Sequence, residues 1–314
     1  MNNLLDPAIL FFLFGVLAGA VRSNLEIPQP ISRFLSLYLL MALGLKGGFA
    51  LAQSGLTTQV ATGLAAAVAL AIIVPLAGYA LLRRFISGFD AAAVAATYGS
   101  VSAVTFVTAT QFLENQQIAF GGHMAAAMAL MESPAIILAV VMANRLRQQV
   151  GVPIGKVLHE SFTDGAQMLL LGAMVVGLLT GDAGKAAMQP FSGDLFKGML
   201  SFFLLDMGLM AARNLSQVRG KSPWLLAYAV VAPIAHAALA LAIGWATGLP
   251  AGDTTLLMVL AASASYIAVP AALRFAIPEA NPSLYFGLSL GITFPMNIVF
   301  GIPFYSYCAQ HLLG

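Results

Sequence analysis

Long hydrophobic runs alternate along the chain with short segments that hold most of its charged residues, together with Pro and Gly. The runs at 62–82, 125–143 and 224–243 each reach the roughly 20 apolar residues needed to cross the hydrocarbon core of a bilayer. Cutting the chain at the short segments gives ten candidate spans, at 7–21, 34–53, 60–82, 91–112, 121–143, 164–180, 196–212, 224–247, 254–273 and 283–308. Because a chain in lipid must satisfy its backbone groups internally, each span predicts a helix. The pattern therefore predicts an all-α polytopic membrane protein with ten transmembrane helices.

Composition excludes the main alternatives. Only 8% of the 314 residues are charged and 60% are hydrophobic, whereas soluble domains carry about 25% charged residues. Soluble, disordered and nucleic-acid-binding proteins are thereby excluded. A single cysteine, Cys308, rules out an internal disulfide. With no Walker sequence or His-Glu-x-x-His motif, we expect neither an enzyme nor a cofactor, so that any transport must be driven by a gradient.

The distribution of Lys and Arg predicts the orientation. If the N-terminus is outside, eleven cationic residues fall on cytoplasmic connections and three, Lys46, Lys185 and Lys197, fall outside. This asymmetry follows the positive-inside rule. We therefore expect both termini outside and the linker 146–163 in the cytoplasm.

The linker separates five spans from five, and the two halves resemble each other. Leu39–Leu45 matches Phe203–Leu209 at an offset of 164, and Asp90–Ser102 matches Asp253–Ser265 at an offset of 163. Because five is odd, the second half must lie upside down in the membrane. We expect inverted repeats at 1–145 and 164–314, a common plan of secondary transporters.

Each repeat carries a Ser-x-Ser pair in the middle of a span. Ser100 and Ser102 follow Asp90, which marks the start of the fourth span, by 10 and 12 residues, and Ser263 and Ser265 follow Asp253, which marks the start of the ninth, by the same numbers. At 1.5 Å per residue this is ~15 Å, the depth of the midplane. Gly, Ser and Pro nearby favour broken helices, whose N–H groups and dipoles hold an anion. Close packing of small residues on neighbouring helices is the alternative explanation.

Other polar residues also lie at membrane depth. Glu132 precedes Ser133-Pro134 in the fifth span, and an intramembrane carboxylate is a functional candidate for a cation or proton site. Thr293 and Asn297 occupy the matching region of the tenth span and suit Na⁺ coordination. Hydrogen bonding between helices is the alternative role for all three. For Asp206, in the seventh span, we favour a structural role.

These residues resemble the single-polypeptide sodium-dependent bicarbonate transporter family over nearly the whole chain. The motifs that carry the resemblance are Gly44-Leu45-Lys46-Gly47-Gly48, Ser100-Val101-Ser102, Glu132-Ser133-Pro134-Ala135, Ala232-Pro233-Ile234-Ala235-His236, Ala261–Ser265 and Leu273–Ser283. The resemblance implies a bile-acid:sodium-symporter-like fold, usually trimeric, in the inner or plasma membrane. Spans three to five and eight to ten would form a core that moves as an elevator against a gate of spans one, two, six and seven.

The resemblance also implies the site. Bicarbonate would bind where the broken spans four and nine cross, with Na⁺ beside it as the coupling ion. The substrate-binding candidates are Gly99, Ser100, Ser102, Thr105, Ser263 and Ser265. The weaker cation-binding candidates are Glu132, Thr293 and Asn297. The short linker gives no support for a cytoplasmic regulatory protein.

The chain departs from the family pattern near the second crossing. The family typically has an Asp after the Ser run and then Ser-Gly-Pro-Pro, whereas this chain has Tyr266, Ala268 and Val269 followed by Pro270-Ala271. In the first crossing, Ala103-Val104-Thr105 stands where the family has Gly-Ser-Thr. Two alternatives to Na⁺-coupled bicarbonate uptake therefore stay open. One is a carrier of another small anion or one coupled to H⁺ through Glu132, and the other is a membrane receptor or scaffold that does not transport.

Overall fold

The computed structural model describes residues 5–147, 153, 155, 159, 163–215 and 221–314, and these residues form helices with no strand among them. The longer helices are α1 (Pro7–Ala20), α2 (Gln29–Ser54), α3 (Thr58–Leu82), α4 (Gly88–Gly99), α5 (Ala103–Asn115), α6 (His123–Leu146), α8 (Gly165–Met188), α9 (Phe196–Asn214), α10 (Pro223–Thr247), α11 (Ala251–Ala262), α12 (Ala268–Ala276) and α15 (Ile302–Leu313). The last span also contains α13 (Pro282–Leu288) and α14 (Phe294–Met296), with π-helical turns η4 (Ser289–Thr293) and η5 (Asn297–Gly301) beside them. Most of the linker predicted at 146–163 lies outside the described residues.

The helices follow the predicted apolar runs. Seven helical stretches of the described chain are long and apolar enough to cross a bilayer. One of them, 165–214, holds both the sixth and the seventh predicted spans, with non-helical backbone at Gly181 (φ 54°) and the π-helix η2 (Gln189–Asp194) inside it. The first predicted span corresponds to the shorter apolar helix α1, and the ninth to the pair α11 and α12. The protein is therefore a multi-pass helical membrane protein, while the count of ten spans stays a prediction.

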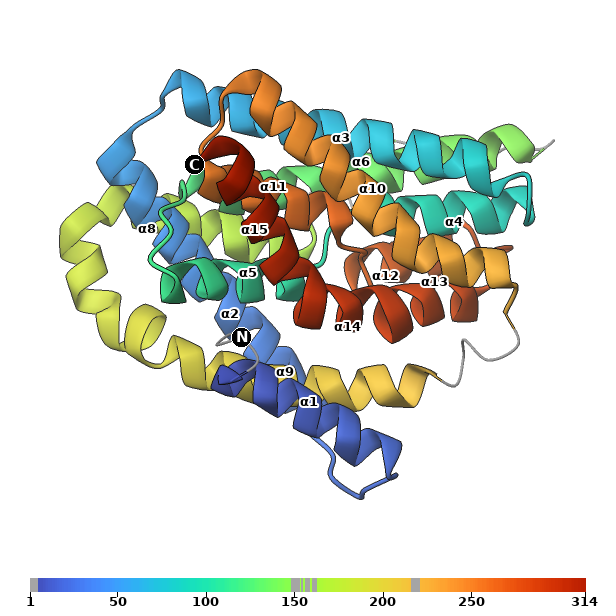
Figure 1. Cartoon of the computed structure of the whole chain (residues 1–314), viewed down its shortest axis with the longest axis horizontal. Coiled ribbons are helices and arrows are strands. Elements are labelled where there is room, and N and C mark those ends of the chain that lie inside the picture. Colours follow the sequence, from blue (N-terminus) through green and yellow to red (C-terminus); the bar gives the residue numbers. More distant parts are fainter. Residues whose placement is uncertain (1–4, 148–152, 154, 156–158, 160–162, 216–220) are drawn as a thin grey trace.

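Close helix pairing joins the two halves of the chain. α1 packs against α9, and α2 packs against α8 (Figure 1). The α1–α9 contact depends on two glycines. A β-carbon on Gly15 would lie 2.2 Å from the Leu205 carbonyl oxygen, and one on Gly208 would lie 2.2 Å from the Phe12 carbonyl oxygen. Small residues at such positions let helix backbones approach closely in a membrane.

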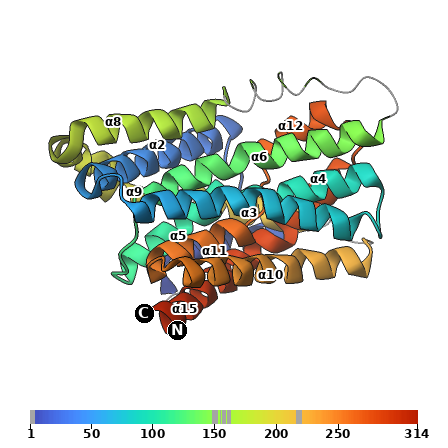
Figure 2. The same ribbon diagram turned by 90° about the horizontal axis from the view of Figure 1, so that it is seen from above.

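Two spans are interrupted in the middle, as the Ser-x-Ser pairs predict. α4 ends at Gly99 and α5 begins at Ala103, whereas α11 ends at Ala262 and α12 begins at Ala268. Figures 1 and 2 place α5 and α11 towards one end of the long axis, and α4 and α12 towards the other. The two broken spans thus run in opposite directions and meet at their breaks.

Carboxylates at the starts of the broken spans tie each half to the other. The Asp90 Oδ1 atom accepts a hydrogen bond from the Asn281 backbone N–H (2.8 Å), and the Asp253 Oδ1 atom accepts one from the Gly121 N–H (2.6 Å). Near the first of these contacts, the Arg147 guanidinium binds both carboxylate oxygens of Glu279, at 2.8 and 2.6 Å. This hydrogen bonding lowers the pKa of the Glu279 carboxyl below its ordinary value.

Candidate functional site

The two interruptions are hydrogen-bonded directly to each other. The Ser102 backbone N–H donates to the Ser263 hydroxyl (2.9 Å), and the Ser265 N–H donates to the Thr97 carbonyl (2.8 Å). Each break therefore satisfies backbone groups that the other leaves free, as buried polar groups require. The Ser263 hydroxyl in turn donates to the Leu260 carbonyl (2.9 Å). The crossing is thus a defined polar junction in an apolar interior.

Ser102 and Ser265 line a cavity of about 60 Å³ beside this junction. The Ser102 Oγ atom caps α5 by accepting hydrogen bonds from the Thr105 N–H (3.2 Å) and the Thr105 hydroxyl (2.9 Å). The Ser265 Oγ atom accepts one from the Val269 N–H (3.3 Å). Because both oxygens act as acceptors in these bonds, neither bond uses the hydroxyl proton of Ser102 or Ser265. Two hydroxyl donors from opposite breaks suit a small anion.

The other substrate-binding candidates play different parts. The Ser263 hydroxyl accepts the Ser102 N–H that joins the two breaks. Neither Ser263 nor Ser100 is among the described residues that line this cavity. The Ser100 hydroxyl is buried and has no hydrogen-bond partner among the described residues. Gly99 packs so closely that a β-carbon there would lie 2.6 Å from atoms of Pro75. Thr105 is hydrogen-bonded to Ser102 and does not line the cavity within the described residues.

Tyr266 lies across the cavity at the position that departs from the family pattern. Its side chain is buried and packs edge-on against Phe294, with ring centroids 5.2 Å apart. Its hydroxyl interacts with Ser102 and lies 3.5 Å from the Met207 sulfur of α9. The phenol therefore gives the cavity a neutral hydroxyl and a wall of aromatic carbon.

Glu132 borders the same cavity from α6. Its Oε2 atom accepts a hydrogen bond from the Gln167 side-chain amide of α8 at 2.5 Å. Gln167 and the cavity-lining Ser36 of α2 were not among the residues that sequence patterns indicated. A polar residue in an otherwise apolar span was the only signal available for either one.

Thr293 and Asn297 are hydrogen-bonded to protein groups elsewhere. The Thr293 hydroxyl donates to the Ala229 carbonyl (2.7 Å) and contacts the Tyr98 hydroxyl (2.6 Å). The Asn297 amide donates to the Ala262 carbonyl (2.8 Å), and its oxygen accepts from the Tyr305 hydroxyl (2.9 Å). Within the described residues neither one borders the cavity that Glu132 borders. The structure thus separates the three cation-binding candidates.

Asp206, for which we favour a structural role, accepts a hydrogen bond from the Ser32 hydroxyl of α2.

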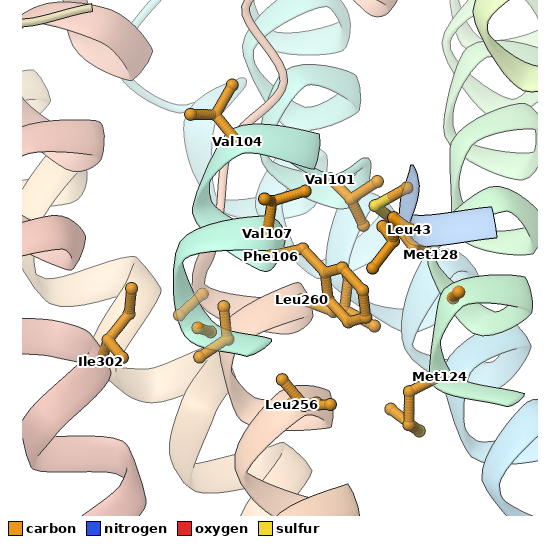
Figure 3. Packing of buried hydrophobic residues seen from close by; sticks show 14 of the residues in the cluster. Leu43, Val101, Val104, Phe106, Val107, Met124, Met128, Leu256, Leu260 and Ile302 are labelled. Carbon is orange, nitrogen blue, oxygen red and sulfur yellow. The ribbon is translucent and has the colours of Figure 1, made fainter. Parts of the chain in front are cut away.

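A second, larger cavity of about 260 Å³ lies on the other side of an apolar layer. Figure 3 shows this layer, in which Leu43 and Met128 lie close to Val101, with Phe106 and Met124 further along. Leu43, Phe106 and Met124 border the larger cavity, whereas Val101 and Met128 border the smaller one. All five are buried. The crossing is therefore closed off from the larger cavity in this conformation.

The sequence Gly287-Leu288-Ser289-Leu290-Gly291 has the spacing of a hydrolase nucleophile elbow. That motif requires a turn between a strand and a helix. Ser289 instead lies in helical structure, at the junction of α13 and η4, and its hydroxyl donates to the Tyr285 carbonyl (2.7 Å). The spacing is coincidental.

Two interrupted helices that meet at a polar cavity inside a multi-pass helical protein are typical of secondary transporters. The chain belongs to the Na⁺-dependent bicarbonate transporter superfamily, whose family model matches residues 7–310, nearly the whole sequence. No individual curated protein matches the chain significantly. Membership of this superfamily indicates a transporter of bicarbonate and Na⁺, which is not an enzyme.

Proposed function

We propose that this protein is a secondary active transporter that takes up bicarbonate together with Na⁺ by an elevator movement. The observation that carries the proposal is the meeting of the Ser102 and Ser265 hydroxyls at one cavity beside the crossed helix breaks. Bicarbonate is a small anion with three oxygens, and hydroxyl donors bind it without a buried cation. The cavity has room for an anion of this size.

Helix pairing supports the division into a core and a gate. The proposed gate consists of α1, α2, α8 and α9, in which α1 pairs with α9 and α2 with α8. The proposed core contains both broken spans together with α3, α6, α10 and α13–α15. The Asp90 and Asp253 contacts hold this core together at both ends of the broken spans. These ties are internal to the core, whereas the Glu132–Gln167 hydrogen bond and the Lys46–Glu114 ion pair cross from the core to the gate and must break when the core moves. We place the protein in the inner or plasma membrane as a homotrimer with both termini outside.

The smaller cavity lies between the proposed core and gate. Ser102, Ser265 and Tyr266 line it from the core, and Ser36 and Gln167 line it from the gate. Under the predicted orientation, the starts of α2 and α8 are cytoplasmic, so this cavity lies on the cytoplasmic side of the apolar layer. The conformation is accordingly the one that releases substrate into the cell.

Uptake of labelled bicarbonate into proteoliposomes tests the proposal directly. We expect accumulation with an inward Na⁺ gradient and none with K⁺ in its place. Collapse of the Na⁺ gradient by an ionophore controls for leakage of the vesicles. Accumulation that is equal with and without the gradient contradicts Na⁺ coupling, and a lack of accumulation under every gradient contradicts transport of bicarbonate.

Proton coupling is the second candidate, and the position of Glu132 favours it. This carboxylate borders the substrate cavity, and the other two cation-binding candidates do not. If Na⁺ is the coupling ion and Glu132 has a structural role, the change E132Q keeps the side-chain shape and retains Na⁺-driven uptake. If Glu132 carries the coupled proton, uptake follows a pH gradient without Na⁺ and E132Q abolishes that dependence. Measuring wild type and E132Q under each gradient alone separates the two.

A further inference from the structure

The larger cavity carries cationic side chains in a part of the chain that the proposed function leaves unused. It lies at the predicted outer ends of α2, α5 and α8, and its volume is about 260 Å³. Among the described residues, Lys46 and Lys185 line it together with one carboxylate, that of Glu114. Gln53, Gln189 and Ser192 add uncharged polar groups. This is enough space for a small anion that keeps part of its hydration shell.

The described side chains that line this cavity carry one excess positive charge, from Lys46 and Lys185 against Glu114. Asp182 and Asp194 are not among them; they accept hydrogen bonds from Gln53 (2.7 Å) and Gln189 (3.1 Å), which leave their negative charge in place. The Lys185 ammonium has no hydrogen-bond or ion-pair partner among the described residues. Because Lys46 is paired with Glu114, the Lys185 ammonium is the charged group in the cavity that has no partner within the described residues.

Lys46 lines this cavity from α2 and forms an ion pair with Glu114 of α5 there. Its ammonium binds both oxygens of Glu114, at 2.9 and 3.1 Å, and lies 4.1 Å from the centre of the Phe196 ring. The exposed fractions of the two paired side chains are 27% for Lys46 and 37% for Glu114. Water and solutes therefore reach the pair, and an incoming anion can compete with Glu114 for the ammonium.

The Lys46–Glu114 ion pair lies at the predicted outer ends of α2 and α5, and both helices extend from there towards the crossing. On α2, the residues that precede Lys46 at spacings of three and four, and lie along the same side of the helix, are Leu43, Leu40 and Ser36. On α5, Thr110 and Phe106 lie four and eight residues before Glu114, and Ser102 caps the start of the same helix. The ion pair thus ties the proposed gate helix α2 to the proposed core helix α5 just outside the apolar layer.

We propose that the larger cavity is a capture site for a small oxyanion or carboxylate, and that Lys46 selects its negative charge. Glu114 is the internal anion that the ligand displaces from Lys46. Displacement also removes the tie between α2 and α5, so that capture favours movement of the core. The inference rests on the proposed function, because it treats the cavity as the entrance of the transport path.

Opposite effects of two neutralising variants test this assignment. For labelled bicarbonate uptake, K46Q is expected to raise the KM about fivefold, the factor that one partly exposed ion pair supplies. E114Q leaves the shape of the cavity and frees Lys46, so it is expected to lower the KM. K197Q is the matched control, because Lys197 forms an outer ion pair with Asp6 (3.3 Å) and does not line the cavity within the described residues.

A purely structural ion pair predicts a different result. Both K46Q and E114Q then lower the melting temperature and change the KM in the same direction, and this outcome overturns the proposal. An unchanged KM in K46Q also overturns it.

Binding to the S102A/S265A variant separates this inference from the proposed function. In that background the crossing hydroxyls are absent, so bicarbonate is expected to raise the melting temperature only through the larger cavity. Adding K46Q should abolish this stabilisation, and its persistence contradicts the role of Lys46. If wild-type protein takes up no bicarbonate and Lys46-dependent stabilisation is nevertheless present, the proposed function fails and the capture site stands.

Discussion

The double variant S102A/S265A is expected to lose Na⁺-driven bicarbonate uptake by roughly a hundredfold or more. In the proposed site each hydroxyl donates a hydrogen bond to a charged ligand, and two such bonds together are worth ~3 kcal/mol or more. Ser102 and Ser265 come from different helix breaks and border the same cavity. Their loss therefore weakens the anion site without removing any apolar packing. Initial rates of uptake at a fixed Na⁺ gradient measure the effect.

The S263A variant is the matched control for this experiment. Ser263 lies at the same crossing but accepts the Ser102 N–H instead of lining the cavity. Removing its hydroxyl leaves a buried N–H unpaired, which lowers stability more than it lowers affinity. Ser102 also caps α5, so the melting temperature of each variant must be measured alongside uptake. Uptake by folded S102A/S265A at the wild-type rate contradicts the site.

The interruptions could be predicted from the sequence because they depend on local composition. Two Ser residues repeated at an offset of 163, with Gly99 before the first pair and Pro270 after the second, already favour a broken helix at each Ser-x-Ser pair. The cavity face could not be predicted in the same way. Which Ser of each pair lines the cavity depends on how the two breaks pass each other, and that is set by tertiary contacts such as the bond from Ser265 to Thr97.

The cation-binding candidates show the same limit of sequence patterns. Glu132, Thr293 and Asn297 lie in matching spans and at similar depth, so the sequence favours a shared site. In the folded chain Glu132 pairs with Gln167 of α8, whereas Thr293 bonds to the Ala229 carbonyl of α10. Membrane depth alone does not say which helix a polar side chain faces. The alternative of helix–helix hydrogen bonding, left open by the sequence, describes the observed contacts of all three.

Replacing Asn297 by alanine is expected to have the second large effect, a loss of stability. Its amide donates to the Ala262 carbonyl at the end of α11, and its oxygen accepts from Tyr305 of α15. The first bond joins the second break to the last span, and the second holds the Asn297 side chain in place within that span. We expect N297A to lose about 2 kcal/mol of stability, because two buried groups are left unpaired and interhelical bonds in membranes are individually modest. Thermal unfolding in detergent at constant Na⁺ measures the loss.

The variant N297D distinguishes this structural role from coordination of Na⁺. An aspartate keeps the oxygen that accepts from Tyr305 but loses the amide donor and sets a carboxylate against the Ala262 carbonyl. N297D is therefore expected to melt below N297A, with an unchanged Na⁺ concentration for half-maximal uptake in the protein that remains folded. A ligand to Na⁺ predicts the reverse, since a carboxylate binds the cation more strongly than an amide does. Stabilisation of N297D by Na⁺, together with a lower half-maximal Na⁺ concentration, would restore Asn297 to the cation site.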